Sequence, residues 1–119
     1  MQRKKVVMIV DDEHWIRTML LEVLSCAGHI GLGAKNGVEA LGLVEREHPD
    51  IVLVDHHLPD TDGLTLQREI KNIKPDIKLI FMSGSNDKKI ILAAREGGAD
   101  AFLTKPFDVM ELLQLVENL

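Results

Sequence analysis

Two apolar runs of this sequence are each followed by acidic residues, and these carboxylates are the side chains best suited to chemistry. Asp11 and Asp12 follow the run 6–10, and Asp55 follows the run 51–54. Carboxylates that lie close together repel one another, and burial raises their pKa values unless a cation is present. Mg²⁺ is the natural cation, since it prefers one or two carboxylates with a backbone oxygen and keeps several waters. The sequence therefore predicts a hard-cation site if the fold gathers these acids.

Two further polar residues lie just beyond later apolar runs. Ser83 follows the run 77–82, and Lys105 lies just beyond the run 101–103. A lysine can act as a point charge on a phosphoryl oxygen, and a serine hydroxyl can donate a hydrogen bond to another such oxygen. A carboxylate beside Mg²⁺, with a lysine and a hydroxyl around it, can form an aspartyl phosphate. We therefore expect Asp55 to be the nucleophile, with Lys105 and Ser83 as its catalytic partners.

Alternating strands and helices must position these groups. Four consecutive apolar residues at 51–54, three of them β-branched, are typical of a strand buried on both faces. Helices are indicated by apolar residues at i, i+3 and i+4 and by Gly or Pro at their ends. The expected strands are 5–10, 30–34, 51–55, 77–82 and 101–103, and the expected helices are 12–27, 37–48, 63–72, 86–96 and 108–119.

Five such alternations predict an α/β fold, namely a flavodoxin-like (βα)5 doubly wound parallel five-stranded sheet in the order 2-1-3-4-5. In this order the first and third strands are neighbours at the switch point, where ligands bind beyond the carboxyl ends of the strands. Asp11, Asp12 and Asp55 would then share one crevice, with Ser83 and Lys105 on its far side.

Composition limits the class of protein. The 119 residues predict one domain over 1–119, with 45% hydrophobic and 28% charged residues. No apolar run approaches a membrane span. A single cysteine, Cys26, cannot form an internal disulfide and fits a reducing cytoplasm. A net charge of -5 argues against direct nucleic-acid binding by this segment.

The motifs together resemble the receiver domain of two-component response regulators, with the single-domain architecture of chemotaxis regulators. The resemblance covers essentially the whole chain and depends on the order and spacing of several short motifs. These motifs are Asp11-Asp12, Gly28-His29-Ile30, the segment 34–41, the segment Asp55-His56-His57-Leu58-Pro59-Asp60-Thr61-Asp62-Gly63, Ser83-Gly84 and Ala101-Phe102-Leu103-Thr104-Lys105-Pro106-Phe107.

This resemblance implies a phosphorylation-activated signalling module rather than an enzyme that acts on a separate substrate. Asp55 would accept a phosphoryl group from a sensor histidine kinase, a histidine phosphotransfer protein or a small phosphodonor. Ser83 and Phe102 would form the switch pair, and a cis peptide would precede Pro106. The implied Mg²⁺ ligands are Asp11, Asp12, Asp55 and the backbone carbonyl of His57.

Three positions depart from the family pattern or vary within it. His57 occupies a position that varies widely and can influence hydrolysis of the acyl phosphate. Gly97 stands where relatives usually have a larger apolar residue, which predicts a looser corner at the end of the helix 86–96. Phe102 replaces a tyrosine, so the switch position lacks a hydroxyl but keeps a ring that can move inward.

Three other functions and a receiver without phosphorylation fit the sequence less well. A phosphohydrolase similar to the haloacid dehalogenases needs an acid two residues after the nucleophile, where this chain has His57. A flavodoxin-type flavin carrier needs a Ser, Thr and Gly loop where this chain has Asp11-Asp12-Glu13, which would repel a phosphate. A transition-metal site at His14, His56 and His57 is disfavoured because adjacent residues leaving a strand point apart. A receiver that has lost phosphorylation is disfavoured because the five site residues are present.

The resemblance to receivers also implies an output surface formed by the helix 86–96, the strand 101–103 and the helix 108–119. On the last helix Val109, Leu112, Leu113 and Val116 form the core-facing stripe, which leaves Met110, Leu115 and Leu119 outside it. On the helix 86–96 the resemblance to the family implies that Ile91, Leu92 and Ala94 are buried and that Ile90 is outside. A homodimer or protein partner would bind around Ile90, Phe102 and Leu115; the alternative is that these apolar residues are merely scattered on the surface.

Overall fold

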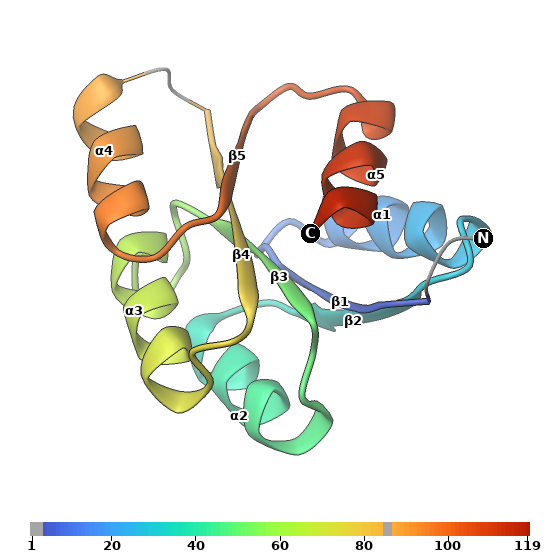
Figure 1. Cartoon of the computed structure of the whole chain (residues 1–119), viewed down its shortest axis with the longest axis horizontal. Helices are drawn as coiled ribbons and strands as arrows, with labels where there is room; N and C mark the ends of the chain where they lie inside the picture. Colours follow the sequence, from blue (N-terminus) through green and yellow to red (C-terminus); the bar gives the residue numbers. More distant parts are fainter. Residues whose placement is uncertain (1–3, 85–86) are drawn as a thin grey trace.

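The computed structural model describes residues 4–84 and 87–119, and it has the predicted α/β architecture (Figure 1). The strands are β1 (Val6–Val10), β2 (Ile30–Ala34), β3 (Ile51–Asp55), β4 (Lys78–Ser83) and β5 (Ala101–Thr104). The helices are α1 (His14–Cys26), α2 (Gly37–Glu47), α3 (Gly63–Ile73), α4 (Lys88–Glu96) and α5 (Val109–Asn118). All strand pairs are parallel, and the sheet order β2-β1-β3-β4-β5 confirms the predicted topology.

The sheet is the middle of three layers, with α1 and α5 on one face and α2, α3 and α4 on the other (Figure 1). Because side chains alternate along a strand, each central strand contributes to both cores. Ile51 and Leu53 of β3 belong to the core under α1 and α5, whereas Val52 and Val54 belong to the core under α2 and α3. The uninterrupted apolar run of β3 thus reflects burial on both sides. Within the ranges that the structure describes, we find no helix with the length and apolarity of a membrane span.

The glycines that dilute β2 have a packing role. A Cβ on Gly31 would lie 2.8 Å from Leu21 Cδ2, and a Cβ on Gly33 would lie 3.2 Å from Leu21 Cδ1. A side chain at either glycine would therefore require the Leu21 side chain to move. The absence of side chains at these two positions therefore lets α1 pack directly on the edge strand.

Helix boundaries differ from prediction by one or two residues. The first helix begins at His14 rather than at residue 12, with Glu13 in the N-cap position. The predicted start of the fourth helix at Asn86 lies outside the described residues, and the described helix begins at Lys88 with Asp87 as its N-cap.

The predicted burial of Leu92 on α4 is wrong. Leu92 is 53% exposed and Ala94 is fully buried, while Ile90 and Ile91 are both partly buried. Residues two apart on a helix point about 200° from each other, so Leu92 and Ala94 cannot share the inner face. Ile90 and Ile91, four and three residues before Ala94, lie on the inner side with it.

The final helix follows its predicted stripe more closely. Leu112 and Val116 are fully buried, and Met110 is 61% exposed. Leu115 and Leu119, which were expected outside the stripe, are partly buried and pack against the core under α1 and α5. This side of α5 is therefore less available to a partner than the sequence suggested.

Candidate functional site

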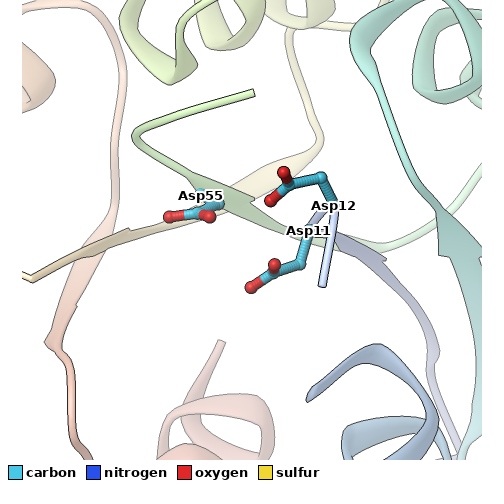
Figure 2. A group of neighbouring side chains, drawn as sticks. All are labelled: Asp11, Asp12 and Asp55. Carbon is cyan, nitrogen blue, oxygen red and sulfur yellow. The ribbon is translucent and has the colours of Figure 1, made fainter. Parts of the chain in front are cut away.

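Strand pairing brings the three predicted acids to one edge of the sheet. In the β1–β3 pair Val10 lies opposite Val54, so the residues that follow them meet at the carboxyl ends of both strands. Figure 2 shows Asp11, Asp12 and Asp55 gathered there, and one carboxylate oxygen of each lies within 4.8 Å of the others. Asp11 is completely buried, Asp55 is 7% exposed and Asp12 is exposed. The prediction that these acids gather at one edge of the sheet is confirmed.

Lys105 places its ammonium group between two of these acids. Its Nζ lies 2.8 Å from Asp11 Oδ2 and 3.3 Å from Asp55 Oδ2. The backbone holds Lys105 there, because its N–H donates to the Ser83 carbonyl at 2.7 Å where β4 pairs with β5. The Lys105–Pro106 peptide is cis, as the family resemblance implies.

The position of Lys105 gives it a role that was not predicted from the sequence. The acids were expected to repel one another unless a cation was present, and Lys105 was expected to contact an incoming phosphoryl oxygen. In the structure Lys105 itself supplies a positive charge to Asp11 and Asp55. The sequence could not indicate this second role, since no local pattern links a lysine to acids so far away in the chain.

Burial and charge act in opposite directions on the two partners of this pair. Burial raises the pKa of the Asp55 carboxyl, the Lys105 charge lowers it and the Asp11 charge raises it, and the net shift is upward. Burial lowers the pKa of the Lys105 ammonium, but the hydrogen bond to Asp11 and the charges of Asp55 and Asp11 outweigh it, so this pKa also rises. Lys105 is therefore held in its charged form, and the charge on Asp55 remains only partly compensated.

Contacts that sequence reasoning missed hold the Asp11 segment. Asp11 Oδ1 accepts a hydrogen bond from the Glu13 N–H at 3.0 Å. Arg17 Nη1 on α1 donates to the Asp11 backbone carbonyl at 2.8 Å. Arg17 lies on the predicted first helix, but nothing in the sequence pattern distinguishes it from a solvated helix charge.

The loop 56–62 after β3 is closed by backbone contacts. The Gly63 N–H donates to the His56 carbonyl at 2.8 Å, and His57 pairs with Asp62 in an antiparallel bridge. A Cβ at Gly63 would collide with the Asp55 carbonyl oxygen, so glycine allows α3 to begin directly beside Asp55. Asp62 caps α3 by accepting from the Thr65 N–H at 2.8 Å.

The two histidines of this loop are arranged differently from the prediction. Their ring centroids lie 4.3 Å apart, and the His56 ring also lies 5.5 Å from that of Phe81. The expectation that the adjacent side chains point apart was wrong, because β3 ends at Asp55 and strand alternation does not extend into the loop. Among the residues that the structure describes, the groups able to hold a metal include no histidine.

The proposed switch residues lie on neighbouring strands. Ser83 is the last residue of β4 and is 4% exposed, whereas Phe102 on β5 is partly buried. The Arg95 guanidinium of α4 lies over the Phe102 ring, 5.7 Å from its centroid, a geometry that allows a cation–π interaction. Arg95 of α4 thus lies over one face of the ring on β5.

A buried amide occupies the corner that Gly97 was expected to leave loose. Gln67 of α3 is completely buried, and its Nε2 donates to the Ala94 carbonyl at 2.7 Å. A Cβ on Gly97 would lie 2.6 Å from this nitrogen. Gly97 thus leaves room for the Gln67 side chain, which joins α3 to α4.

The donor set at the carboxyl edge fits a small hard cation. Three carboxylates offer oxygen ligands within 4.8 Å of one another, and oxygen is the donor that Mg²⁺ prefers. The set contains no sulfur or imidazole donor, which softer metals favour. A carboxylate at the crevice, a lysine in contact with it and a cation-binding group beside it can together support phosphoryl transfer.

Comparison with known proteins identifies the family of this chain. The model of the response regulator receiver domain family matches residues 7–117. Sporulation initiation phosphotransferase F of Bacillus subtilis is 36% identical over 112 residues, which cover 94% of this chain and 90% of that protein. The DNA-binding transcriptional regulator NtrC of Escherichia coli is 38% identical over 116 residues, which cover 98% of this chain but 25% of NtrC.

Solved structures agree in fold. A CheY-like response regulator receiver domain protein from Methanospirillum hungatei matches with a TM-score of 0.92 and 28% identity, over 98% of this chain and 93% of that one. Receiver domains of two-component systems are signalling modules that phosphorylation activates, and they are regulators rather than ordinary enzymes. The chain belongs to the response regulator receiver domain family.

Proposed function

We propose that Asp55 is the phosphoacceptor of this receiver. Asp11, Asp12, Asp55 and the backbone carbonyl of His57 would hold Mg²⁺. The observation that carries the proposal is the position of Lys105 Nζ, 2.8 Å from Asp11 and 3.3 Å from Asp55 at the carboxyl edge of the sheet. A cation fixed against a carboxylate at the switch point of an α/β sheet suits the binding of an anionic phosphoryl group.

The chemistry of this step follows from the side chains. A carboxylate oxygen of Asp55 attacks the phosphorus of the donor, and the bond from phosphorus to the leaving group breaks with its electron pair. Lys105 donates to one phosphoryl oxygen, and the Ser83 hydroxyl donates to another. Mg²⁺, when bound, neutralises negative charge on the phosphoryl oxygens. The donor would be a sensor histidine kinase, a histidine phosphotransfer protein or a small phosphodonor, and the receiver would catalyse both its phosphorylation and its dephosphorylation.

Phosphorylation would then change the face formed by α4, β5 and α5. Ser83 lies at the end of β4, and Phe102 lies on the adjacent strand under Arg95 of α4. A shift of Ser83 toward the phosphoryl group would let the Phe102 ring move inward and release its contact with Arg95. Leu92 on α4 is 53% exposed and Met110 on α5 is 61% exposed, so these residues, instead of Ile90 and Leu115, would meet a protein partner or a second copy.

Intact mass after incubation with acetyl phosphate and Mg²⁺ tests the acceptor. Wild type should gain one hydroxylamine-sensitive phosphoryl group, and Asp55→Asn should gain none. Asp76→Asn, the same change in the exposed loop before β4, should label as wild type does. Labelling of Asp55→Asn would refute the assignment.

The output face is tested with beryllofluoride, which stands in for the phosphoryl group. Its addition should shift the sedimentation coefficient or strengthen binding to a purified histidine kinase. Leu92→Glu should remove this response while Asp55 still becomes phosphorylated. A response that survives Leu92→Glu and Met110→Glu would place the output surface elsewhere.

A further inference from the structure

The carboxylate of Asp60, in the loop 56–62, accepts hydrogen bonds from the first turn of α2. Its Oδ1 accepts from the Gly37 N–H at 2.8 Å, and its Oδ2 accepts from the Val38 N–H at 3.1 Å. The first N–H groups of a helix have no partner within the helix, and a negative charge there is favourable. The bond from Gly37 is the main reason that the pKa of Asp60 is lowered; burial opposes it and the bond from Val38 adds to it.

The fit of the loop against α2 is close. A Cβ on Gly37 would lie 2.6 Å from Thr61 Cγ2 and 3.4 Å from Asp60 Oδ1. Any side chain at residue 37 would therefore require Thr61 to shift away from the helix. The contact is thus a packed junction between two segments that are 23 residues apart in the chain, as measured from Gly37 to Asp60.

The same loop carries the backbone carbonyl that the proposed function assigns to Mg²⁺. His57 and Asp62 are bridged at the base of the loop, and Asp60 lies between them in the chain. Two restraints therefore limit the loop: the backbone bridge at its base and the Asp60 carboxylate at its tip. A backbone ligand has no side-chain rotamer to adjust, so its position depends on these restraints.

We propose that Asp60 is a positioning residue for the cation site: by fixing the loop 56–62 on the start of α2, it preorganises the His57 carbonyl for Mg²⁺. The inference rests on the proposed function, which supplies the ligand set. Asp60 need not touch the ion. Asp60 would order the loop 56–62 when the chain folds. Binding of Mg²⁺ then does not have to pay the entropy of ordering this loop.

Titration calorimetry of the unphosphorylated protein with MgCl₂ tests the proposal. Asp60→Ala should raise the Mg²⁺ dissociation constant about tenfold, the lower end of the range for groups that support a metal ligand. Asp60→Asn removes the same charge but keeps an oxygen that can accept one N–H, so it should lie between Asp60→Ala and wild type. Asp76→Ala, the control for loss of a distant acid, should bind Mg²⁺ as wild type does.

A second variant separates position from charge. Gly37→Ala keeps the Asp60 carboxylate but requires the neighbouring Thr61 to shift. If this shift loosens the contact of the loop with α2, Gly37→Ala should also weaken Mg²⁺ binding. In Asp60→Ala and Gly37→Ala, labelling by acetyl phosphate should slow at low Mg²⁺ and return close to the wild-type rate at saturating Mg²⁺. Hydrogen exchange at the amides of residues 37 and 38 should accelerate in Asp60→Ala.

The outcomes distinguish this inference from the function on which it rests. Unchanged Mg²⁺ affinity with faster exchange at residues 37 and 38 would mean that Asp60 only caps α2, which overturns the inference. Equal weakening by Asp60→Ala and Asp60→Asn, with none in Gly37→Ala, would reduce its role to charge and also overturn it. Failure of the wild type to bind Mg²⁺ would overturn the metal assignment of the proposed function together with this inference.

Discussion

Gly97 and Gln67 form a pair whose interaction a double-mutant cycle can measure. The Gln67 amide is completely buried and donates to the Ala94 carbonyl, and within the described residues its Oε1 has no hydrogen-bond partner. A Cβ on Gly97 would lie 2.6 Å from Gln67 Nε2. Gly97 has a φ of -80°, which alanine adopts without strain. Gly97→Ala therefore perturbs the amide and leaves the backbone unstrained.

The size of the stability change in Gly97→Ala follows from the contacts of the Gln67 amide. Displacing the amide breaks its bond to Ala94 and leaves a buried donor unpaired, which costs about 1–3 kcal/mol. Replacing glycine by alanine returns about 0.4–1 kcal/mol by restricting the unfolded chain. We therefore expect Gly97→Ala to lower the free energy of unfolding by about 1 kcal/mol.

The effect of Gly97→Ala on the free energy of unfolding should change sign when the Gln67 amide is absent. Gln67→Leu removes one hydrogen bond and one unpaired oxygen, so the free energy of unfolding should change by less than about 1 kcal/mol. In that background Gly97→Ala meets no amide and should stabilise the protein by about 0.4–1 kcal/mol. The expected interaction energy between the two sites is about 1–3 kcal/mol.

Urea unfolding of the four proteins, followed by circular dichroism with a common m-value, measures this cycle. Gly42→Ala in the middle of α2 is the matched control; its Cβ would lie 3.3 Å from the guanidinium end of the Arg46 side chain, which can move. The Gly42→Ala variant should be more stable than wild type by about 0.5–1 kcal/mol. Single effects that add to within about 0.5 kcal/mol would refute the proposed contact.

Four further outcomes are expected. Asp55→Asn should raise the melting temperature at pH 7, because the raised pKa of Asp55 makes its charge unfavourable; the gain should vanish as the pH falls below the ordinary value of 3.8, and a pH-independent gain would contradict this cause. Lys105→Met should lower the free energy of unfolding by about 1–3 kcal/mol in EDTA, because buried Asp11 loses its cation, and stability equal to wild type in a denaturant titration would exclude that role. Mg²⁺ at ten times its dissociation constant should stabilise the wild type by about 1.4 kcal/mol in the same titration, and EDTA should reverse the effect. Leu92→Glu should change stability by less than about 0.5 kcal/mol because Leu92 is exposed, whereas Ala94→Glu should prevent folding; a large loss in Leu92→Glu would show that α4 is placed differently.

The errors of the sequence analysis fall where local periodicity is weak. The strand Ile51–Asp55 and its acid were predictable because a run buried on both faces has a composition of its own. The short helix α4 contains a single fully buried residue, Ala94, so its inner face could not be deduced from apolar content alone. The resemblance to the family implied that Leu92 is buried, whereas the structure leaves it on the outer side of α4.

Side-chain contacts that depend on how the elements pack had no signal in the sequence. Gln67 on α3 and Arg17 on α1 would be ordinary solvated residues on an isolated helix, and only the packed structure gives them the carbonyls of Ala94 and Asp11 as partners. Asp60 likewise has the composition of a turn residue. Its role depends on where the start of α2 lies after the sheet has formed.

The sequence by itself determined the order of strands and helices and the positions of the acids at strand ends, because hydrophobic period and turn residues act locally. Topology rules then placed those ends at one edge of the sheet. Only the tertiary structure decided which positively charged side chain lies against which carboxylate. Lys105 reaches Asp11 across 94 residues of chain, since the register of β5 on β4 and the packing behind the strands set the last few ångströms of that approach.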